Sequence, residues 1–319
     1  MPERGAPSEA RRATFGKPAG APVRRATPLH DRMRRLYIAC LLPALAVVLL
    51  LVVLPLAYQF YLSLRDFSLL RFSDRFIGFQ NYTRLLQDPL LLRALWNTIL
   101  FTLGATLADF VIGMAMALVV YRLAPPWSNW LRAIVLLPMM VMPVAVAVLW
   151  RNIIFNPPYE VFNRLFGLTG SVLASPRTAL WGITLTAVWA FYPTVFLLLS
   201  AGLDALPKAP VEAAEIDGAS FGQVILYVIL PLMQPVIFVT LTMKAIDSFL
   251  TFTFAWIMTE GGPGGASHLL STYIYTRSFA NMDYGYGASL AIVMVLCSAT
   301  LSFGLVAYVW SGRYGKAFS

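Results

Sequence analysis

The sequence predicts an all-α integral membrane protein with six transmembrane helices, and two observations support this fold class. First, hydrophobic residues make up 59% of the chain and charged residues only 12%, and the mean hydropathy is +0.70. These proportions exclude a soluble globular domain. Second, several uninterrupted apolar runs are long enough to cross a bilayer, which takes about 20 helical residues.

The first apolar run, at 36–62, follows a basic N-terminal tail at 1–35. The tail is rich in Pro, Ala, Gly and Arg and has almost no large apolar side chains, which predicts a disordered cytoplasmic segment. The charged region is too long for a cleaved signal peptide, and the apolar run is long enough to span. We therefore expect a retained anchor helix at 36–62 and a transmembrane core at 63–319.

Five further spans are expected, and an even total places both termini on one side of the membrane. Cytoplasmic segments are enriched in Lys and Arg, and a heavy basic cluster lies immediately before the first span. We therefore expect both termini in the cytoplasm, and we attribute the net charge of +9 to topology and lipid headgroups rather than to nucleic acid. The expected ranges are 94–121, 131–153, 179–202, 225–257 and 286–311.

Prolines and cysteines also fall inside these spans. The prolines predict kinks that neighbouring helices tolerate, and both a gating role and ordinary packing are open for them. We interpret the cysteines as small apolar residues, not as a disulfide or a metal site. The residues concerned are Pro43, Pro55, Pro138, Pro143 and Pro193, with Cys40 and Cys297.

A small polar island at 207–222 separates the fourth and fifth spans. Pro207 and Pro210 suit the start of a short helix, and Gly218 permits the backbone to turn. A second short helix, from about Ser220, then leads into the fifth span. The island is therefore expected to be a helix–turn–helix on the cytoplasmic surface, with an ordinary solvated loop as the alternative.

The order of residues in the island resembles a known motif. It resembles the EAA loop of permease subunits in binding-protein-dependent ABC importers, where this loop is the coupling helix that docks on the ATP-binding subunit. The resemblance implies the type I ABC importer permease fold, with a cytoplasmic coupling helix between helices 4 and 5. The matching positions are Glu212, Ala213, Ala214, Asp217, Gly218 and Ala219, followed by Leu230 and Pro231.

Two further segments resemble the carbohydrate type of these permeases, of the maltose and glycerol-phosphate kind. One is 76–82, with Asp88-Pro89 and Asn97-Thr98; the other is 259–263, followed by Tyr273-Ile274-Tyr275, Phe279 and 284–288. The family pattern usually has Gly where this chain has Glu260. Gly261, Gly262 and Pro263 are expected to form a tight turn near the pore mouth, with a plain connector as the alternative.

These resemblances cover about residues 36–311 and imply partners as well as a fold. They imply a pore subunit that moves a sugar or sugar-like solute by alternating access in a bacterial or archaeal plasma membrane. The implied partners are a second homologous permease, two ATP-binding subunits and an extracytoplasmic binding protein. The sequence has no phosphate-binding Gly-rich loop with Lys-Ser/Thr, so we expect the partner to bind ATP and Mg, and this chain to have no cofactor, metal or catalytic residue.

Charged residues inside spans are functional candidates because burying them in a bilayer is costly. Lys244 and Asp247 are three residues apart on the fifth span, so they share a helix face and are able to pair. Contact with the substrate and a neutralised packing pair are both open for them. Asp109 in the second span has no partner nearby in the sequence, which favours a packing or interface role.

Sugars bind through aromatic faces and hydrogen-bonding side chains, because they present apolar C–H faces surrounded by hydroxyls. Residues of both kinds occur in the third to fifth spans, although each aromatic alone also suits an interfacial belt. The candidate substrate path consists of Trp150, Asn152, Trp189, Tyr192, Lys244, Asp247, Ser248, Thr251 and Phe252, with Thr253 beside them.

Two other functions compete with the importer. An ion-coupled secondary transporter would use Asp109 and Asp247 as coupling carboxylates, but it predicts internal repeats, and the sequence shows no convincing one. A membrane-embedded enzyme needs converging catalytic groups, yet the two histidines are His30 in the tail and His268 in an expected outer loop. The importer is the leading hypothesis.

Overall fold

The computed structural model describes residues 28–156, 165, 167 and 171–311. It divides into two compact units, Met1–Leu56 and Ala57–Ser319. α1 (Pro28–Val48) runs through a π-helical turn, η1 (Leu49–Val53), into α2 (Leu54–Ser63), and the boundary between the two units falls within α2. Most of the expected tail lies outside the described residues, and α1 takes in the last residues of that range. The segment Cys40–Ser63 has a mean hydropathy of 2.9, as an anchor helix requires.

The second unit is built mainly of helices. Its elements are β1 (Arg65–Ser68), β2 (Ser73–Phe76), α3 (Gln80–Leu86), α4 (Pro89–Arg122), α5 (Trp127–Leu136), η2 (Leu137–Met140), α6 (Pro143–Leu149), η3 (Trp150–Ile154), α8 (Ala179–Asp204), α9 (Lys208–Ile216), α10 (Phe221–Val224), η4 (Ile225–Ile229), α11 (Leu230–Phe249), α12 (Thr253–Thr259), α13 (Leu270–Tyr275), η5 (Thr276–Ala280) and α14 (Tyr284–Ser311).

The expected spans correspond to helices long and apolar enough to cross a membrane. Within the described residues there are five such helices, or six if one bent pair counts as a span. The bent pair takes the place of the third expected span, at 131–153. The five are Cys40–Ser63, Pro89–Arg122, Ala179–Asp204, Phe221–Thr259 and Tyr284–Gly304.

The bend in the third span lies just before Pro143. Trp127–Met140 and Pro143–Ile154 meet at 84°, so this span is not straight. Because the proline ring excludes the helical conformation at the preceding residue, Met142 is extended, with φ −58° and ψ 135°. Pro143 then takes the first position of α6, where a missing N–H leaves no hydrogen bond unmade.

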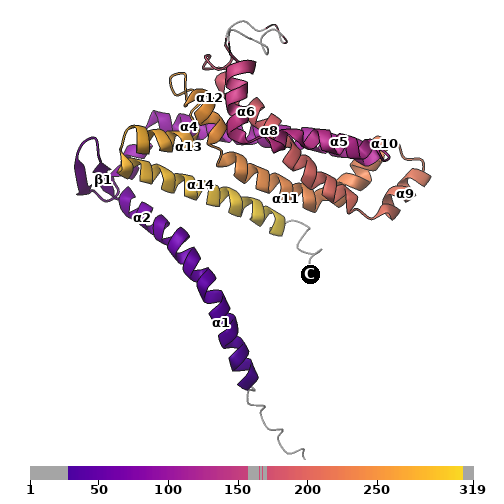
Figure 1. The fold of residues 1–319 in the computed structure, drawn as a ribbon, viewed down its shortest axis with the longest axis horizontal. Helices are drawn as coiled ribbons and strands as arrows, with labels where there is room; N and C mark the ends of the chain where they lie inside the picture. Colours follow the sequence, from indigo (N-terminus) through magenta and orange to yellow (C-terminus); the bar gives the residue numbers. More distant parts are fainter. Residues whose placement is uncertain (1–27, 157–164, 166, 168–170, 312–319) are drawn as a thin grey trace, which may run out of the picture. The chain divides into compact units, whose positions relative to one another are not determined.

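The core of the second unit lies between α4, α8 and α11, which run side by side (Figure 1). The pairing of α4 with α8 is the most extensive helix contact among the described residues. Three apolar clusters fill the space between the helices, around Ile183, Leu199 and Leu270, and each of these three side chains is fully buried.

The bundle has two distinguishable ends (Figure 1). The β-hairpin end holds β1 and β2, whose antiparallel register pairs Arg65 with Phe76. The Asn81 amide donates hydrogen bonds of 2.9 Å to the carbonyls of Ser63 and Arg65, which ties the hairpin to α3. At the other end, the α9 end, α9 and α10 form the short connection between the long helices α8 and α11.

Candidate functional site

The polar island forms a helix–turn–helix, as the sequence predicts. α9 is closed by a Schellman motif: the Ala219 N–H donates to the Ala214 carbonyl at 3.0 Å, and the Gly218 N–H donates to the Glu215 carbonyl at 3.1 Å. This turn requires a left-handed residue, and Gly218 has φ +79°. Ser220 then begins α10, and the Gln223 side chain accepts a hydrogen bond from the Ser220 N–H at 2.8 Å.

The motif residues of the island divide between two faces of α9. Ala214 and Ala219 are half-buried and pack against the cluster around Leu199, so they hold α9 on the bundle. The remaining motif side chains are exposed together with Ile216, which is 85% exposed although it is apolar. The exposed motif residues are Glu212, Ala213 and Asp217.

Arg122, at the end of α4, contacts both short helices of the island. Its guanidinium lies 3.9 Å from the Glu215 carboxylate and 3.8 Å from the centre of the Phe221 ring. An exposed ion pair contributes little to stability by itself. The position of Arg122 nevertheless joins the end of α4 to both α9 and α10.

Three charged side chains meet inside the bundle. Lys244 Nζ lies 3.1 Å from Asp109 Oδ2 and 3.4 Å from Asp247 Oδ2. The predicted pairing of Lys244 with Asp247 is therefore confirmed, and Asp109 has a partner on α11 that is distant in the sequence. The Asp109 side chain is fully buried, that of Lys244 is 7% exposed and that of Asp247 is 61% exposed. The cluster therefore runs from the core to an accessible surface.

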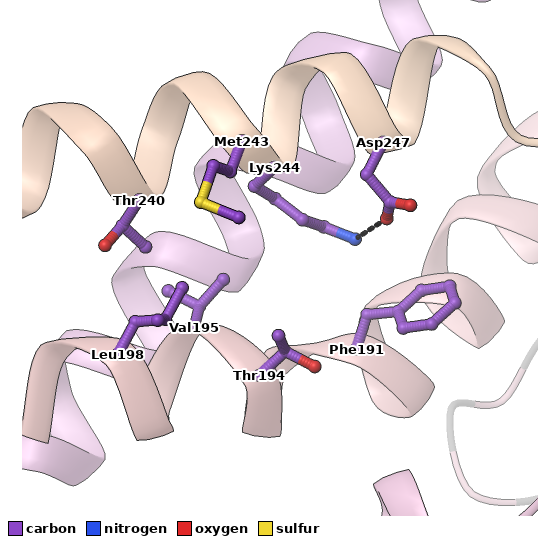
Figure 2. Close-up of a pocket in the computed structure, with 8 residues that line it drawn as sticks. All are labelled: Phe191, Thr194, Val195, Leu198, Thr240, Met243, Lys244 and Asp247. Carbon is purple, nitrogen blue, oxygen red and sulfur yellow. Dashed lines mark hydrogen bonds and ion pairs between the residues drawn. The ribbon is translucent and has the colours of Figure 1, made fainter. Parts of the chain in front are cut away.

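The accessible part of this cluster lines a cavity between α8 and α11, with a volume of 270 Å³ (Figure 2). Lys244 and Asp247 point toward one another on one side, and Phe191 lies below them. Lys244 Nζ is 4.3 Å from the centre of the Phe191 ring, a cation–π contact. The other lining residues are Thr194, Val195, Leu198, Thr240 and Met243.

The structure does not bring all residues of the candidate path to this cavity. Trp150 and Trp189 pack together, with ring centres 5.9 Å apart, and Tyr192 is half-buried against the cluster around Leu199. Asn152 lines a separate cavity of 410 Å³ near Pro263. The sequence reasoning left Phe191 and Thr194 out of the path, because nothing in their local pattern separates them from other span residues.

Ser248, Thr251 and Phe252 lie at the junction of α11 and α12. The Ser248 hydroxyl is buried and has no hydrogen-bond partner among the described residues. The Thr251 hydroxyl donates to the Asp247 carbonyl at 3.2 Å, and the Thr251 carbonyl accepts from Ser271 at 2.5 Å. The helix break is thus held on both sides, close to the charged cluster.

The loop after α12 forms the expected turn. Glu260 has φ +53° and Gly261 has φ +85°. A left-handed residue at 260 explains why glycine suits that position, since a side chain there costs about 1–2 kcal/mol. At Gly261 a Cβ atom would collide with the His268 ring. The Gly262 carbonyl accepts a hydrogen bond from Ser267 at 2.5 Å.

Asp88 is the centre of a hydrogen-bond network at the β-hairpin end. Its carboxylate caps α4 through the N–H groups of Leu90 and Leu91 and accepts hydrogen bonds from the hydroxyls of Tyr273 and Tyr286. Burial opposes ionisation of Asp88, but these donated hydrogen bonds outweigh it and lower its pKa. Burial, together with the hydrogen bond to Asp88, raises the pKa of Tyr273 to about 12.

Asn97 and Thr98 extend this network to the loop before α13. The Asn97 amide donates to the carbonyls of Ala266 and His268 at 2.9 and 3.0 Å. The Thr98 hydroxyl accepts from the Leu270 N–H at 2.8 Å. The sequence segments that resemble carbohydrate-type permeases are therefore partly a scaffold that joins α4 to α13 and α14. No group of three or more His, Cys, Asp or Glu side chains in the described part of the chain is placed to hold a metal ion.

Comparisons with known proteins agree with this architecture. Residues 109–312 match the family model described as "Binding-protein-dependent transport system inner membrane component". The chain is also similar to a bacterial ABC transporter of known structure that imports the acidic polysaccharide alginate. The TM-score is 0.74 at 21% identity, over 88% of this chain and 98% of that one, which shows the type I importer permease fold.

Two curated relatives cover most of the chain. The sulfoquinovosyl glycerol transport system permease of Agrobacterium fabrum is 34% identical over 85% of this chain and 88% of its own length. The trehalose/maltose transport system permease of Thermococcus litoralis is 33% identical over 90% and 97%. Together with the family match over 109–312, these similarities show that the chain belongs to the family of inner-membrane components of binding-protein-dependent transport systems.

Proposed function

We propose that this chain is one of two pore subunits in an ATP-driven importer of sugars or sugar-like solutes. An extracytoplasmic binding protein delivers the solute, and the pore passes it to the cytoplasm by alternating access. The chain pairs with a second homologous permease and with two subunits that bind ATP and Mg. It resides in a bacterial or archaeal plasma membrane with both termini in the cytoplasm, and it catalyses no reaction itself.

The observation that carries this proposal is the exposed face of α9. Glu212, Ala213 and Asp217 lie on a short helix that is firmly closed at Gly218 and held to the bundle by Ala214 and Ala219. An exposed isoleucine on the same helix, Ile216, suits the apolar floor of a groove on a partner. Movement of the ATP-binding subunits would then act on α9, and α9 would act through Arg122 on α4.

The solute class rests on the named relatives and on the charged cavity. One relative is named as a permease for sulfoquinovosyl glycerol, and the other is named as a permease for trehalose and maltose. The cavity beside Lys244 and Asp247 offers donors, acceptors and an aromatic ring to a polyhydroxylated solute. The candidate path therefore centres on Lys244 and Asp247, with Phe191 and Thr194 added. Thr251 and Phe252 follow these residues in the chain.

The test is uptake by the whole transporter reconstituted in vesicles, with its binding protein outside and ATP inside. Glu212→Ala should weaken docking of the ATP-binding subunit about tenfold, which corresponds to a loss of about 1.4 kcal/mol, and should lower ATP-dependent uptake. Gly218→Val should do the same by distorting the left-handed turn. Both variants should insert into the membrane normally and should retain less of the ATP-binding subunit after a salt wash.

The matched control is Glu260→Ala, which removes a carboxylate at the opposite end of the bundle. It should leave retention of the ATP-binding subunit unchanged. Normal uptake by Glu212→Ala, or uptake that follows an ion gradient without ATP, would exclude the proposed coupling role.

A further inference from the structure

Six aromatic side chains form a continuous row from the β-hairpin end toward the helix break at Thr251. The outer half of the row begins on β1 and continues over the start of α14 to η5. Its ring centres are 5.8 Å apart between Phe67 and Tyr284, and 6.1 Å apart between Tyr284 and Phe279. Both distances lie within the range of direct aromatic contact.

The inner half of the row continues from Phe279 to α13 and α12. The ring centres of Phe279 and Tyr275 are 5.1 Å apart, and those of Tyr275 and Trp256 are 4.5 Å apart. Phe252 closes the row, because its ring stacks on Trp256 at 5.8 Å with an interplanar angle of 14°. Four separate elements therefore contribute to one uninterrupted line of rings after β1.

The rings of this row are accessible, which separates them from the core. Phe279 is 58% exposed, and the other five side chains are half-buried. Neighbouring aromatics on the same helices behave differently, since Phe254 is 1% and Tyr273 is 2% exposed. The faces of these rings are therefore open to contact with another molecule.

The inner end of the row lies next in the chain to a residue bonded to the backbone of the charged cluster. Phe252 directly follows Thr251, whose hydroxyl donates to the Asp247 carbonyl. The Asp247 side chain is 61% exposed on a membrane-spanning helix, where a carboxylate faces a polar cavity or a partner rather than lipid. The inner end of the row therefore follows this carboxylate closely in the chain, and its outer end lies in the β-hairpin outside the spans.

The chemistry of this arrangement fits a pyranose ring better than it fits a lipid chain. A pyranose has an apolar face of C–H groups, which contacts the negative face of an aromatic ring, and hydroxyls at its edge that remain hydrated. Each ring in the row offers a similar contact, so no single ring binds a sugar much more tightly than the next. A sugar is therefore able to move from one ring to its neighbour. Thr251 and Asp247 then provide hydrogen-bonding groups at the inner end.

We infer that the six rings are a stacking track along which pyranose rings pass between the β-hairpin end and the Lys244–Asp247 site. The inference rests on the proposed function, and it adds Phe67, Trp256, Tyr275, Phe279 and Tyr284 to the path that Phe252 had marked.

The experiment is saturation-transfer difference NMR on the complete transporter in nanodiscs, with trehalose and maltose as probes. Saturation of the aromatic protons should transfer to the C–H protons of both sugars. Trp256→Leu and Tyr275→Leu should each weaken sugar binding by about fivefold, whereas Tyr275→Phe should retain the wild-type signal because it keeps the ring. Mannitol, an acyclic polyol without a pyranose face, should receive little saturation.

The matched control is Phe79→Leu, which removes an exposed aromatic at the same end that pairs with Tyr82 at 5.7 Å, outside the row. It should leave the signal unchanged. The track is excluded if neither sugar receives saturation, if Phe79→Leu reduces the signal as much as Trp256→Leu, or if Tyr275→Phe abolishes it. Failure of ATP-dependent uptake by the wild type, with the sugar signal intact, would instead refute the proposed function and leave the track standing.

Discussion

The residues of the EAA-like motif have different physical roles, although they are adjacent in the sequence. Gly218 provides a left-handed turn, and no atom lies within 4 Å of a Cβ built on it, so its conformation rather than space requires glycine. Ala214 and Ala219 are small because they pack against the bundle. Glu212 and Asp217 are exposed, and these are the side chains free to meet a partner.

The buried charges Asp109 and Lys244 give a prediction at the same scale. Lys244→Met should destabilise the protein most, by about 3–5 kcal/mol, because it leaves the fully buried Asp109 carboxylate without its partner. Asp109→Asn should destabilise it less, because Lys244 keeps Asp247 and the Phe191 ring. The measurement is thermal unfolding of the purified protein in detergent.

Asp247→Asn is the matched control for this series, since it removes a carboxylate from the same lysine at an exposed position. It should have the smallest effect, as expected for an exposed ion pair. The double variant Asp109→Asn with Lys244→Met should be more stable than Lys244→Met alone. An equal loss of stability in Asp109→Asn and Asp247→Asn would contradict the assignment of the buried pair.

At the scale of elements, the loop between α12 and α13 contains a half-buried histidine. His268 packs on Gly261, and the His268 carbonyl accepts from the Asn97 amide. Burial, with the nearby positive charge of Arg277, lowers the pKa of His268 below its ordinary value of 6.5. The folded loop therefore favours the neutral form of this ring.

This pKa shift predicts that mild acid lowers the stability of the folded loop. Above pH 6.5 the ring is neutral in both the folded and the open loop, and the contribution to stability is complete. As the pH falls below that value, His268 binds a proton in the open loop but not yet in the folded loop. The stability of the folded loop therefore decreases until the pH reaches the lower pKa of His268 in the folded loop. Hydrogen-exchange protection of residues 259–270 should therefore be lower at about pH 5.5 than at about pH 7.5.

His268→Gln should remove most of this pH dependence, because glutamine does not titrate in this range. Protection of α9, which has no histidine, serves as the internal reference. The same loss of protection at low pH in His268→Gln would show that another group is responsible.

At the scale of the whole molecule, the bundle presents two different ends. The α9 end carries the exposed motif face, and the β-hairpin end carries the network around Asp88 and the outer part of the aromatic row. The distribution of Lys and Arg predicts that the α9 end is cytoplasmic. The proposed direction of transport depends on this orientation.

Cysteine labelling tests the orientation. In a chain carrying Cys40→Ala and Cys297→Ala, a membrane-impermeant maleimide should label Asp74→Cys in intact cells and Glu212→Cys only after permeabilisation. Both positions are exposed in the isolated chain, so the chain is expressed without the ATP-binding subunits, and access to the label then depends on the side of the membrane. Labelling of Glu212→Cys in intact cells would reverse the proposed topology.

The sequence by itself determined the approximate position of the spans and the helix–turn–helix of the island, and it placed Lys244 and Asp247 on one helix face. These features depend on local patterns: apolar run length, turn residues and helical spacing. Only the tertiary structure decided the partner of Asp109, the separation of Asn152 from the cavity at Lys244, the 84° bend before Pro143 and the aromatic row. Each of these depends on which distant helices pack together, and contacts between distant segments leave no periodic signal in a single sequence.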